Sequence, residues 1–310
     1  MKKLSKKTNF LIITVVLTAI LTMLSCAPYL FNKYIEDKRK AANLTIKSID
    51  IPGFKIAYAE GGTGDTIIMI HGSGGNKDNW LYLAKYFTPD YRVIIPDLPG
   101  HGDSSKPQNA NYNHMSQVER LNLFVKELKL TKFHLVGNSM GGNIAGNYAA
   151  DYPDMVKTFA LFDASGVNAP VKSELILLLE KGINPELVKD VNEYDKFLEF
   201  VFVKPPKLPS FMKQYLAEQA VAAEPLDKKI YNDMWSDMYI LESKLNKINA
   251  PTLIVWGDSD KLVHISSVPI FEKNIKNSKS VIIKECGHAP MLEKPAETAA
   301  AYQEFLKGEN

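Results

Sequence analysis

Short apolar runs alternate with stretches of helical periodicity from residue 44 to residue 310 of this chain. At the beginning, Leu44–Ile49 and Phe54–Glu60 favour the two strands of a hairpin. The alternation that follows is typical of an α/β fold, in which helices cover both faces of a mostly parallel sheet. Eight strands are predicted in all. The other strands are Thr66–Ile70, Arg92–Ile95, Phe133–Val136, Thr158–Phe162, Thr252–Val255 and Ser280–Ile283, and the helices between them are Asp78–Phe87, Ser116–Leu128, Asn143–Ala150, Val268–Ile275 and Ala296–Leu306.

One long segment, residues 166–248, interrupts this alternation because it holds helical patterns and no strand-like run. The segment Pro205-Pro-Lys-Leu-Pro209 would end any helix in its middle. An insertion of this size is expected to form a helical cap above the strand ends. The body of the chain therefore divides into a core of residues 44–165 and 249–310 and a cap of residues 166–248. The helices predicted in the cap are Ser173–Lys181, Glu193–Val203, Phe211–Ala222 and Leu226–Ser243.

The first 25 residues have the pattern of a signal peptide or a membrane anchor. Four lysines and no acidic residue precede an uncharged run, Phe10–Leu24, which is short for a transmembrane helix. The segment that ends at Cys26 resembles a bacterial lipoprotein signal, so we expect Cys26 to be lipidated and residues 26–43 to form a tether. The alternative is an uncleaved anchor that continues to about Phe31. Both interpretations place the protein at a bacterial envelope membrane, with its body outside the cytoplasm.

Charge and cysteine content limit the partners that the protein can have. Residues 1–25 hold four lysines and no acid, so the remainder carries 33 basic and 35 acidic side chains. This near-neutral balance argues against a nucleic-acid partner. The two cysteines, Cys26 and Cys286, provide no disulfide framework. No cluster of histidine, cysteine and carboxylate residues has the spacing of a metal site, and no cofactor is expected.

A predicted strand is joined to a predicted helix by Gly137-Asn-Ser139-Met-Gly141, which has the G-x-S-x-G form. A serine on so sharp a turn adopts strained backbone angles, and the flanking glycines allow neighbouring backbone to approach closely. The turn lifts the hydroxyl out of the sheet, and the N-terminus of the helix behind it adds a partial positive charge. Ser139 is therefore the candidate nucleophile. The alternative is an ordinary tight turn with a solvent-facing serine.

A serine hydroxyl needs a general base within hydrogen-bond reach, and the base needs a carboxylate to orient it. His288 follows the last predicted strand, at the carboxyl edge of the sheet where the sites of such folds lie. Asp260 follows the preceding strand and is the candidate acid, with Asp258 as a close rival and Asp163 as a more distant one. Of the other histidines, His134 is expected within a strand, His114 in an exposed polar loop and His264 at some distance after a strand. His71 and His101 begin loops at strand ends and are candidates to shape the site.

Negative charge that develops on the substrate in the transition state must also be stabilised. The glycine-rich segment His71-Gly-Ser-Gly-Gly75 follows the third strand at the level of Ser139. The backbone N–H groups of Ser73 and Met140 are the candidate oxyanion donors. A phosphate-binding loop is the alternative for a glycine-rich segment, but the G-x-x-x-x-G-K and G-x-G-x-x-G patterns are both absent. In the loop Asp97–Ser104, Asp97 is expected to brace the backbone.

These motifs resemble those of the α/β-hydrolase superfamily over residues 44–310. The segments His71–Trp80, Asp97–Ser104, Gly137–Gly142 and Pro251–Gly257 are similar to those of bacterial family V lipases and of membrane-anchored monoacylglycerol lipases. The resemblance implies an α/β-hydrolase fold and carboxylester hydrolysis, with Ser139, Asp260 and His288 as the catalytic triad. One departure concerns Ser73, because those lipases usually have an aromatic residue there.

The sequence thus predicts a serine carboxylester hydrolase that acts on an ester or acylglycerol substrate through an acyl-enzyme on Ser139. One alternative is a carbon–carbon bond hydrolase of the meta-cleavage type. Those enzymes share Gly-Asn-Ser-Met-Gly-Gly, but they commonly have tryptophan where this chain has Ala289. The other alternative is a catalytically dead hydrolase fold that serves as a binding module.

Overall fold

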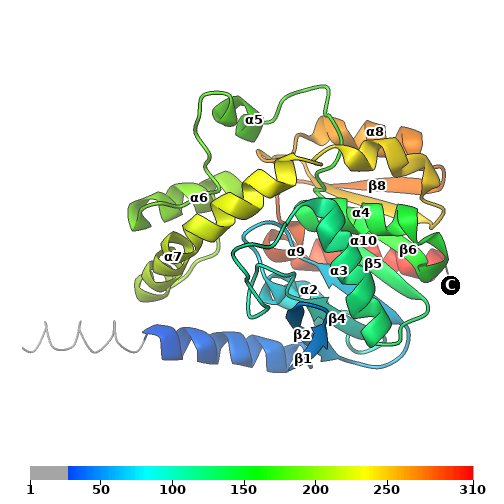
Figure 1. Cartoon of the computed structure of the whole chain (residues 1–310), viewed down its shortest axis with the longest axis horizontal. Coiled ribbons are helices and arrows are strands. Elements are labelled where there is room, and N and C mark those ends of the chain that lie inside the picture. Colours follow the sequence, from blue (N-terminus) through cyan, green and yellow to red (C-terminus); the bar gives the residue numbers. More distant parts are fainter. Residues whose placement is uncertain (1–26, 310) are drawn as a thin grey trace, which may run out of the picture.

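The computed structural model describes residues 27–309, and its centre is one eight-stranded sheet (Figure 1). The strands follow the spatial order β1-β2-β4-β3-β5-β6-β7-β8. β1 and β2 form the predicted hairpin, β2 runs antiparallel to β4, and the six strands from β3 to β8 are parallel. All eight predicted strands are confirmed, with small shifts at their ends. They are β1 (Thr45–Ile51), β2 (Phe54–Gly61), β3 (Thr66–Ile70), β4 (Arg92–Pro96), β5 (Phe133–Asn138), β6 (Val156–Phe162), β7 (Thr252–Gly257) and β8 (Ser278–Ile283).

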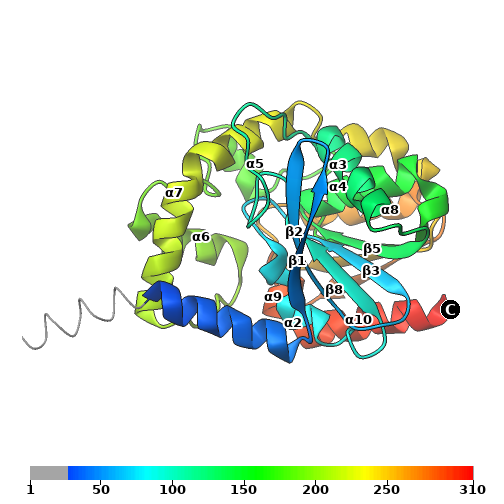
Figure 2. The ribbon, with the colours of Figure 1, turned by 60° about the horizontal axis from the view of Figure 1, so that its bottom comes forward.

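Helices cover both faces of the sheet, and each face buries its own apolar cluster. α3, α4 and α8 pack on one face, whereas α2, α9 and α10 pack on the other (Figures 1 and 2). Every residue of β3, β5 and β7 is buried, because helices cover both sides of these strands. The helices of the core are η1 (Lys77–Trp80), α2 (Leu81–Ala84), α3 (His114–Glu127), α4 (Met140–Asp151), η2 (Pro153–Met155), η5 (Ile265–Ser267), α8 (Val268–Asn274), α9 (Pro290–Glu293) and α10 (Pro295–Gly308).

Between β6 and β7 the chain leaves the sheet and forms the helices of the expected cap. α5, α6 and α7 lie together to one side of the sheet in Figure 1. The apolar side chains Leu175, Phe200 and Val201 join the cap to one of the two core clusters. The helices of the cap are α5 (Glu174–Leu179), η3 (Val191–Glu193), α6 (Tyr194–Val201), α7 (Ser210–Trp235) and η4 (Ile240–Lys247).

The prediction of two helices, Phe211–Ala222 and Leu226–Ser243, is wrong. A single helix of 26 residues, α7, runs through Pro225 and is followed by the separate 3₁₀ helix η4. Proline lacks an N–H group, and its ring leaves the carbonyl four residues earlier without its helical partner. Pro225 is exposed, so water can reach this backbone, and Figure 2 shows α7 as one curved helix.

The described chain begins with a helical segment, residues 27–41, which we call the N-terminal helix. It occupies most of the stretch predicted as a tether, and it passes from the beginning of α7 to the beginning of β1 (Figure 2). Phe31 contacts Tyr215 of α7, with ring centroids 5.5 Å apart, and the hydroxyls of Tyr34 and Tyr82 are hydrogen-bonded. Within residues 27–309, no helix has the length and apolar content needed to cross a membrane. Cys26 and the apolar run Phe10–Leu24 lie outside the described residues.

Candidate active site

Ser139 stands at the sharp turn between β5 and α4, as the G-x-S-x-G pattern predicts. Its backbone angles are φ 56° and ψ −122°, a strained conformation for a residue with a side chain. A Cβ atom on Gly137 would lie 2.2 Å from the carbonyl oxygen of Gly141, so the turn can close only over glycine. The strain is held by backbone hydrogen bonds: Ser139 N donates to Phe162 O at 3.0 Å, and Ser165 N donates to Ser139 O at 3.2 Å.

His288 and Asp260 meet at the carboxyl edge of the sheet. Nδ1 of His288 donates a hydrogen bond to Oδ2 of Asp260 at 2.8 Å, and both side chains are buried. The other carboxylate oxygen of Asp260 accepts from the N–H groups of Leu262 and Val263, at 2.8 and 3.1 Å. These contacts fix the carboxylate and leave Nε2 of His288 as the nitrogen free to exchange a proton. Nε2 is buried and has no hydrogen-bond partner in the described part of the chain.

His288 differs electrostatically from three other buried histidines, His71, His101 and His134. Burial alone would lower the pKa of His288, but the charge and hydrogen bond of Asp260 outweigh it and raise the pKa above its ordinary value. In contrast, burial lowers the pKa of His71 to about 4, that of His101 to about 3 and that of His134 to about 4. Of these four residues, only His288 is hydrogen-bonded to a carboxylate.

His114 is not in an exposed loop, so that prediction is wrong. It is the first residue of α3 and is fully buried, and its Nδ1 contacts Oδ1 of Asp237 at 2.8 Å. Asp237 also accepts hydrogen bonds from the backbone N–H groups of His114 and Met115. The polar residues around His114 suggest an exposed loop. The sequence does not reveal its burial because the partner Asp237, which follows α7, is 123 residues away along the chain.

Asp163, the distant rival for the acid, lies beside Asp260 and His288. One side-chain oxygen from each aspartate and one ring nitrogen of His288 lie within 4.8 Å of one another. Oδ1 of Asp163 accepts from Gly257 N at 2.8 Å, whereas Oδ2 is buried without a partner among residues 27–309. Burial and the Asp260 carboxylate raise the pKa of Asp163 well above its ordinary value. The spacing of these three side chains would also suit a metal ion.

The candidate oxyanion donors lie on either side of Ser139. Met140 is the first residue of α4, so its backbone N–H points out of the helix N-terminus without an intrahelical partner. Ser73 lies in the loop after β3 and lines the same pocket as Ser139 and Met140. The backbone of both residues is thus available to a substrate bound at Ser139.

A pocket of about 520 Å³ opens above Ser139, between the cap and the carboxyl edge of the sheet. This volume is in the range of small-molecule sites. Its walls are mostly apolar and come largely from the cap: Val167, Val171, Leu175, Ile176, Leu179, Met234, Trp235 and Met238. The arrangement can hold an apolar chain with its polar end at the serine.

Two polar residues of the site were not singled out from the sequence. Asn138 lies within the motif itself, and its Nδ2 donates to the carbonyl oxygens of Phe162 and His288, both at 3.0 Å. It thereby ties the histidine loop to the serine turn. Glu186 is half-buried in the pocket wall, and burial raises the pKa of its carboxyl to about 7. Nothing in the local sequence distinguishes Glu186 from the other acidic residues of the cap.

The sequence and the fold of this chain are similar to those of known hydrolases. The sequence model described as alpha/beta hydrolase fold matches residues 65–295. Lipase 1 of Psychrobacter immobilis is 38% identical over 280 residues, which cover 88% of this chain and 87% of the lipase. A monoacylglycerol lipase of Xenopus laevis is 29% identical, covering 86% of this chain and 84% of its own. The solved structure of a membrane phospholipase A described as a bacterial virulence factor has a TM-score of 0.91 and 42% identity, covering 97% of this chain and 99% of its own.

Proposed function

The chain belongs to the alpha/beta hydrolase fold family and is a serine carboxylic ester hydrolase, and from this premise we propose that it is a lipid esterase whose acyl-enzyme forms on Ser139. The observation that carries the proposal is the buried hydrogen bond of 2.8 Å between His288 and Asp260, at the edge of the sheet where Ser139 also stands. A serine, a histidine and a carboxylate in these positions form the catalytic unit of acyl transfer.

In the proposed reaction, Oγ of Ser139 attacks the ester carbonyl while Nε2 of His288 takes the hydroxyl proton. The tetrahedral oxygen accepts hydrogen bonds from the N–H groups of Ser73 and Met140. The carbon–oxygen bond to the alcohol then breaks, and the alcohol leaves with the proton from His288. Water, activated by His288, hydrolyses the acyl-enzyme. Asp260 stabilises the histidine cation throughout and is not itself protonated.

The apolar pocket above Ser139 supports an ester with a long acyl chain as the substrate. Its cap walls can bury an acyl chain, and each buried CH₂ group contributes about 0.8 kcal/mol. We therefore expect kcat/KM to rise with chain length over a series of p-nitrophenyl esters and 1-monoacylglycerols from acetyl to palmitoyl. Leu175→Ala should weaken this dependence and leave hydrolysis of the acetate ester unchanged. Hydrolysis confined to the acetate ester in the wild-type protein would contradict the assignment to lipid esters.

We further propose that the protein is held at an envelope membrane through lipid on Cys26. The proposal is supported by the lysine-rich and apolar pattern of residues 1–25, and the similar solved structure is described as a membrane phospholipase. Lipoprotein processing adds several acyl chains, and each buried CH₂ gives roughly 0.8 kcal/mol, so attachment would be effectively permanent. The N-terminal helix would then connect the lipid to the enzyme.

Replacement of Cys26 by serine should block lipidation and leave a full-length precursor, because serine lacks the thiol that receives the diacylglyceryl group. Mass spectrometry of the intact protein measures this directly. The wild-type protein should begin at a modified Cys26, whereas Cys286→Ser should leave processing unchanged. An intact Met1 and an unmodified Cys26 in the wild-type protein would instead indicate an uncleaved helical anchor. The esterase proposal would be unaffected by that result.

A further inference from the structure

The loop that carries Ser73, residues 71–76, lies directly against the serine turn and is called the oxyanion loop below. A Cβ atom on Gly72 would come within 3.1 Å of Cβ of Ser139, so the two segments are in close contact. β3 holds the beginning of the loop, because it ends at Ile70 within the sheet. An oxyanion donor works only within a narrow range of distances from the reacting oxygen. The anchoring of the far end of the loop therefore matters for catalysis.

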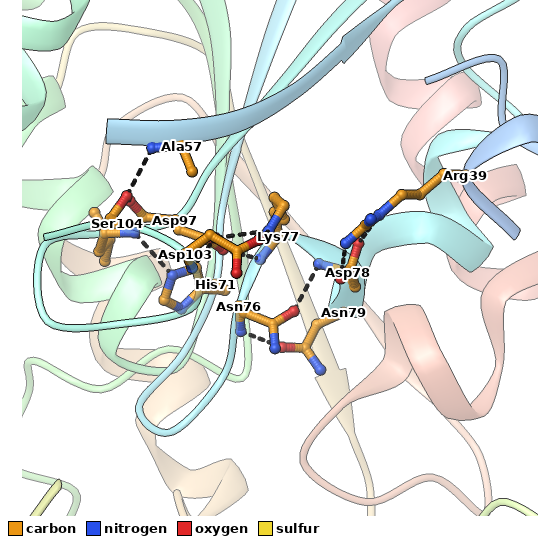
Figure 3. Close-up of polar contacts among 11 residues, drawn as sticks. Arg39, Ala57, His71, Asn76, Lys77, Asp78, Asn79, Asp97, Asp103 and Ser104 are labelled. Atoms are coloured by element: carbon orange, nitrogen blue, oxygen red, sulfur yellow. Dashed lines mark hydrogen bonds and ion pairs between the residues drawn. The ribbon is translucent and has the colours of Figure 1, made fainter. Parts of the chain in front are cut away.

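Lys77 anchors that far end to the core (Figure 3). Its backbone N–H donates to Oδ1 of Asp97 at 2.6 Å, and its Nζ donates to Oδ2 of Asp97 at 2.8 Å and to Asp103 at 2.6 Å. Lys77 is 1% exposed and Asp97 is fully buried. Burial alone would lower the pKa of Lys77, but the carboxylates of Asp97 and Asp103 outweigh it and raise the pKa, so the ammonium group of Lys77 keeps its charge. The role expected of Asp97, bracing the backbone, agrees with these contacts.

Asp78, the next residue, anchors the loop to a different part of the molecule. Arg39 of the N-terminal helix donates from Nε to Oδ1 of Asp78 at 2.8 Å and from Nη2 to Oδ2 at 2.6 Å (Figure 3). Such a two-bond pair fixes orientation as well as distance. Within the same turn, Asp78 N donates to the side chain of Asn76, and Asn76 N donates to the side chain of Asn79. Because Asn76 is the last residue of the oxyanion loop, these hydrogen bonds couple the position of the loop to that of Asp78.

We propose that Arg39 is a positioning residue for the oxyanion loop, so that the N-terminal helix takes part in transition-state stabilisation. This inference rests on the function proposed above. The helix has other attachments to the body of the protein, through Phe31 and Tyr215 and through Tyr34 and Tyr82. Arg39 is therefore not needed merely to dock the helix. The planar guanidinium of Arg39 makes two hydrogen bonds to Asp78, which directly follows Lys77, the residue that anchors the loop.

Arg39→Ala tests this inference, with Arg39→Lys as the conservative variant. We expect kcat on a p-nitrophenyl ester to fall about 10-fold in Arg39→Ala with KM within 2-fold, because a displaced donor costs less than the 10²- to 10³-fold of a removed one. Binding of a trifluoromethyl ketone, which forms a tetrahedral adduct with the serine, should weaken by the same factor. Arg39→Lys should retain part of the activity. The matched control is Lys40→Ala, which removes an exposed ion pair with Glu36 on the same helix and should change neither constant.

An unchanged kcat in Arg39→Ala, or a fall in kcat without weaker binding of the ketone, would overturn the inference. If Arg39→Ala fails to fold, Asp78→Asn removes the same ion pair from the core side with little change in shape and carries the same expectations. These results are distinct from failure of the proposed function, since in that case the wild-type protein itself would neither hydrolyse the ester nor bind the ketone.

Discussion

Replacing Ser139 with alanine should lower kcat for ester hydrolysis by about 10⁵- to 10⁶-fold, and His288→Ala should be nearly as severe. The two effects are similar in size because the members of a catalytic triad act as a unit. The fold should survive in both variants. Alanine keeps the backbone hydrogen bonds that hold the strained turn, and neither side chain lies in the two apolar clusters of the core.

The measurement combines steady-state hydrolysis of a p-nitrophenyl ester with labelling by a fluorophosphonate probe. Ser139→Ala should lose labelling completely, while His288→Ala should be labelled far more slowly than the wild-type protein. Ser116→Ala, a serine substitution on α3 outside the pocket, provides the matched control. Rapid hydrolysis by purified Ser139→Ala, or labelling of that variant at the wild-type rate, would remove the assignment of Ser139 as the nucleophile.

The parts of the fold that were predictable are those whose chemistry is local. β3, β5 and β7 are mostly apolar because helices cover both faces of the sheet, and this burial is visible in composition alone. The serine turn is equally local, because glycines are required within two residues of Ser139. The positions predicted for His288 and Asp260 followed from the rule that loops at the carboxyl edge of a parallel sheet converge. The structure brings these two residues into contact.

The features that could not be predicted depend on contacts between distant segments. Pro225 has a strong local preference against helix interiors, yet α7 continues through it where the chain is exposed. His114 is buried by Asp237, a partner 123 residues away. Arg39 appears in the sequence as part of a basic surface run, and only the folded chain brings it to Asp78, 39 residues later. Burial and ion pairing between segments so far apart leave no periodic pattern in the sequence from which they could be predicted.

The carboxylate that orients the histidine should be Asp260 and not its neighbour Asp163. Asp260→Asn should lower kcat by about 10⁴-fold, as loss of the triad carboxylate does elsewhere, because an amide cannot stabilise the histidine cation and favours the wrong tautomer. Asp163→Asn should lower kcat less than about 10-fold. Burial and the Asp260 charge raise the pKa of Asp163 and so favour its neutral carboxyl form, which asparagine resembles. The amide oxygen can still accept from Gly257 N, as Oδ1 does now.

The pH dependence of the two variants separates the roles further. The proposed mechanism requires neutral His288, so kcat/KM should fall as the pH drops through the pKa of His288, which Asp260 raises. In Asp260→Asn this acid limb should move to lower pH, because the charge that favours the protonated histidine is gone. In Asp163→Asn the limb should stay near its wild-type position.

A severe loss of kcat in Asp163→Asn, with a mild loss in Asp260→Asn, would transfer the orienting role to Asp163, at the end of β6. Asp258→Asn completes the comparison and should have the smallest effect, since the carboxylate of Asp258 contacts Ser259 and Cys286 and not the histidine.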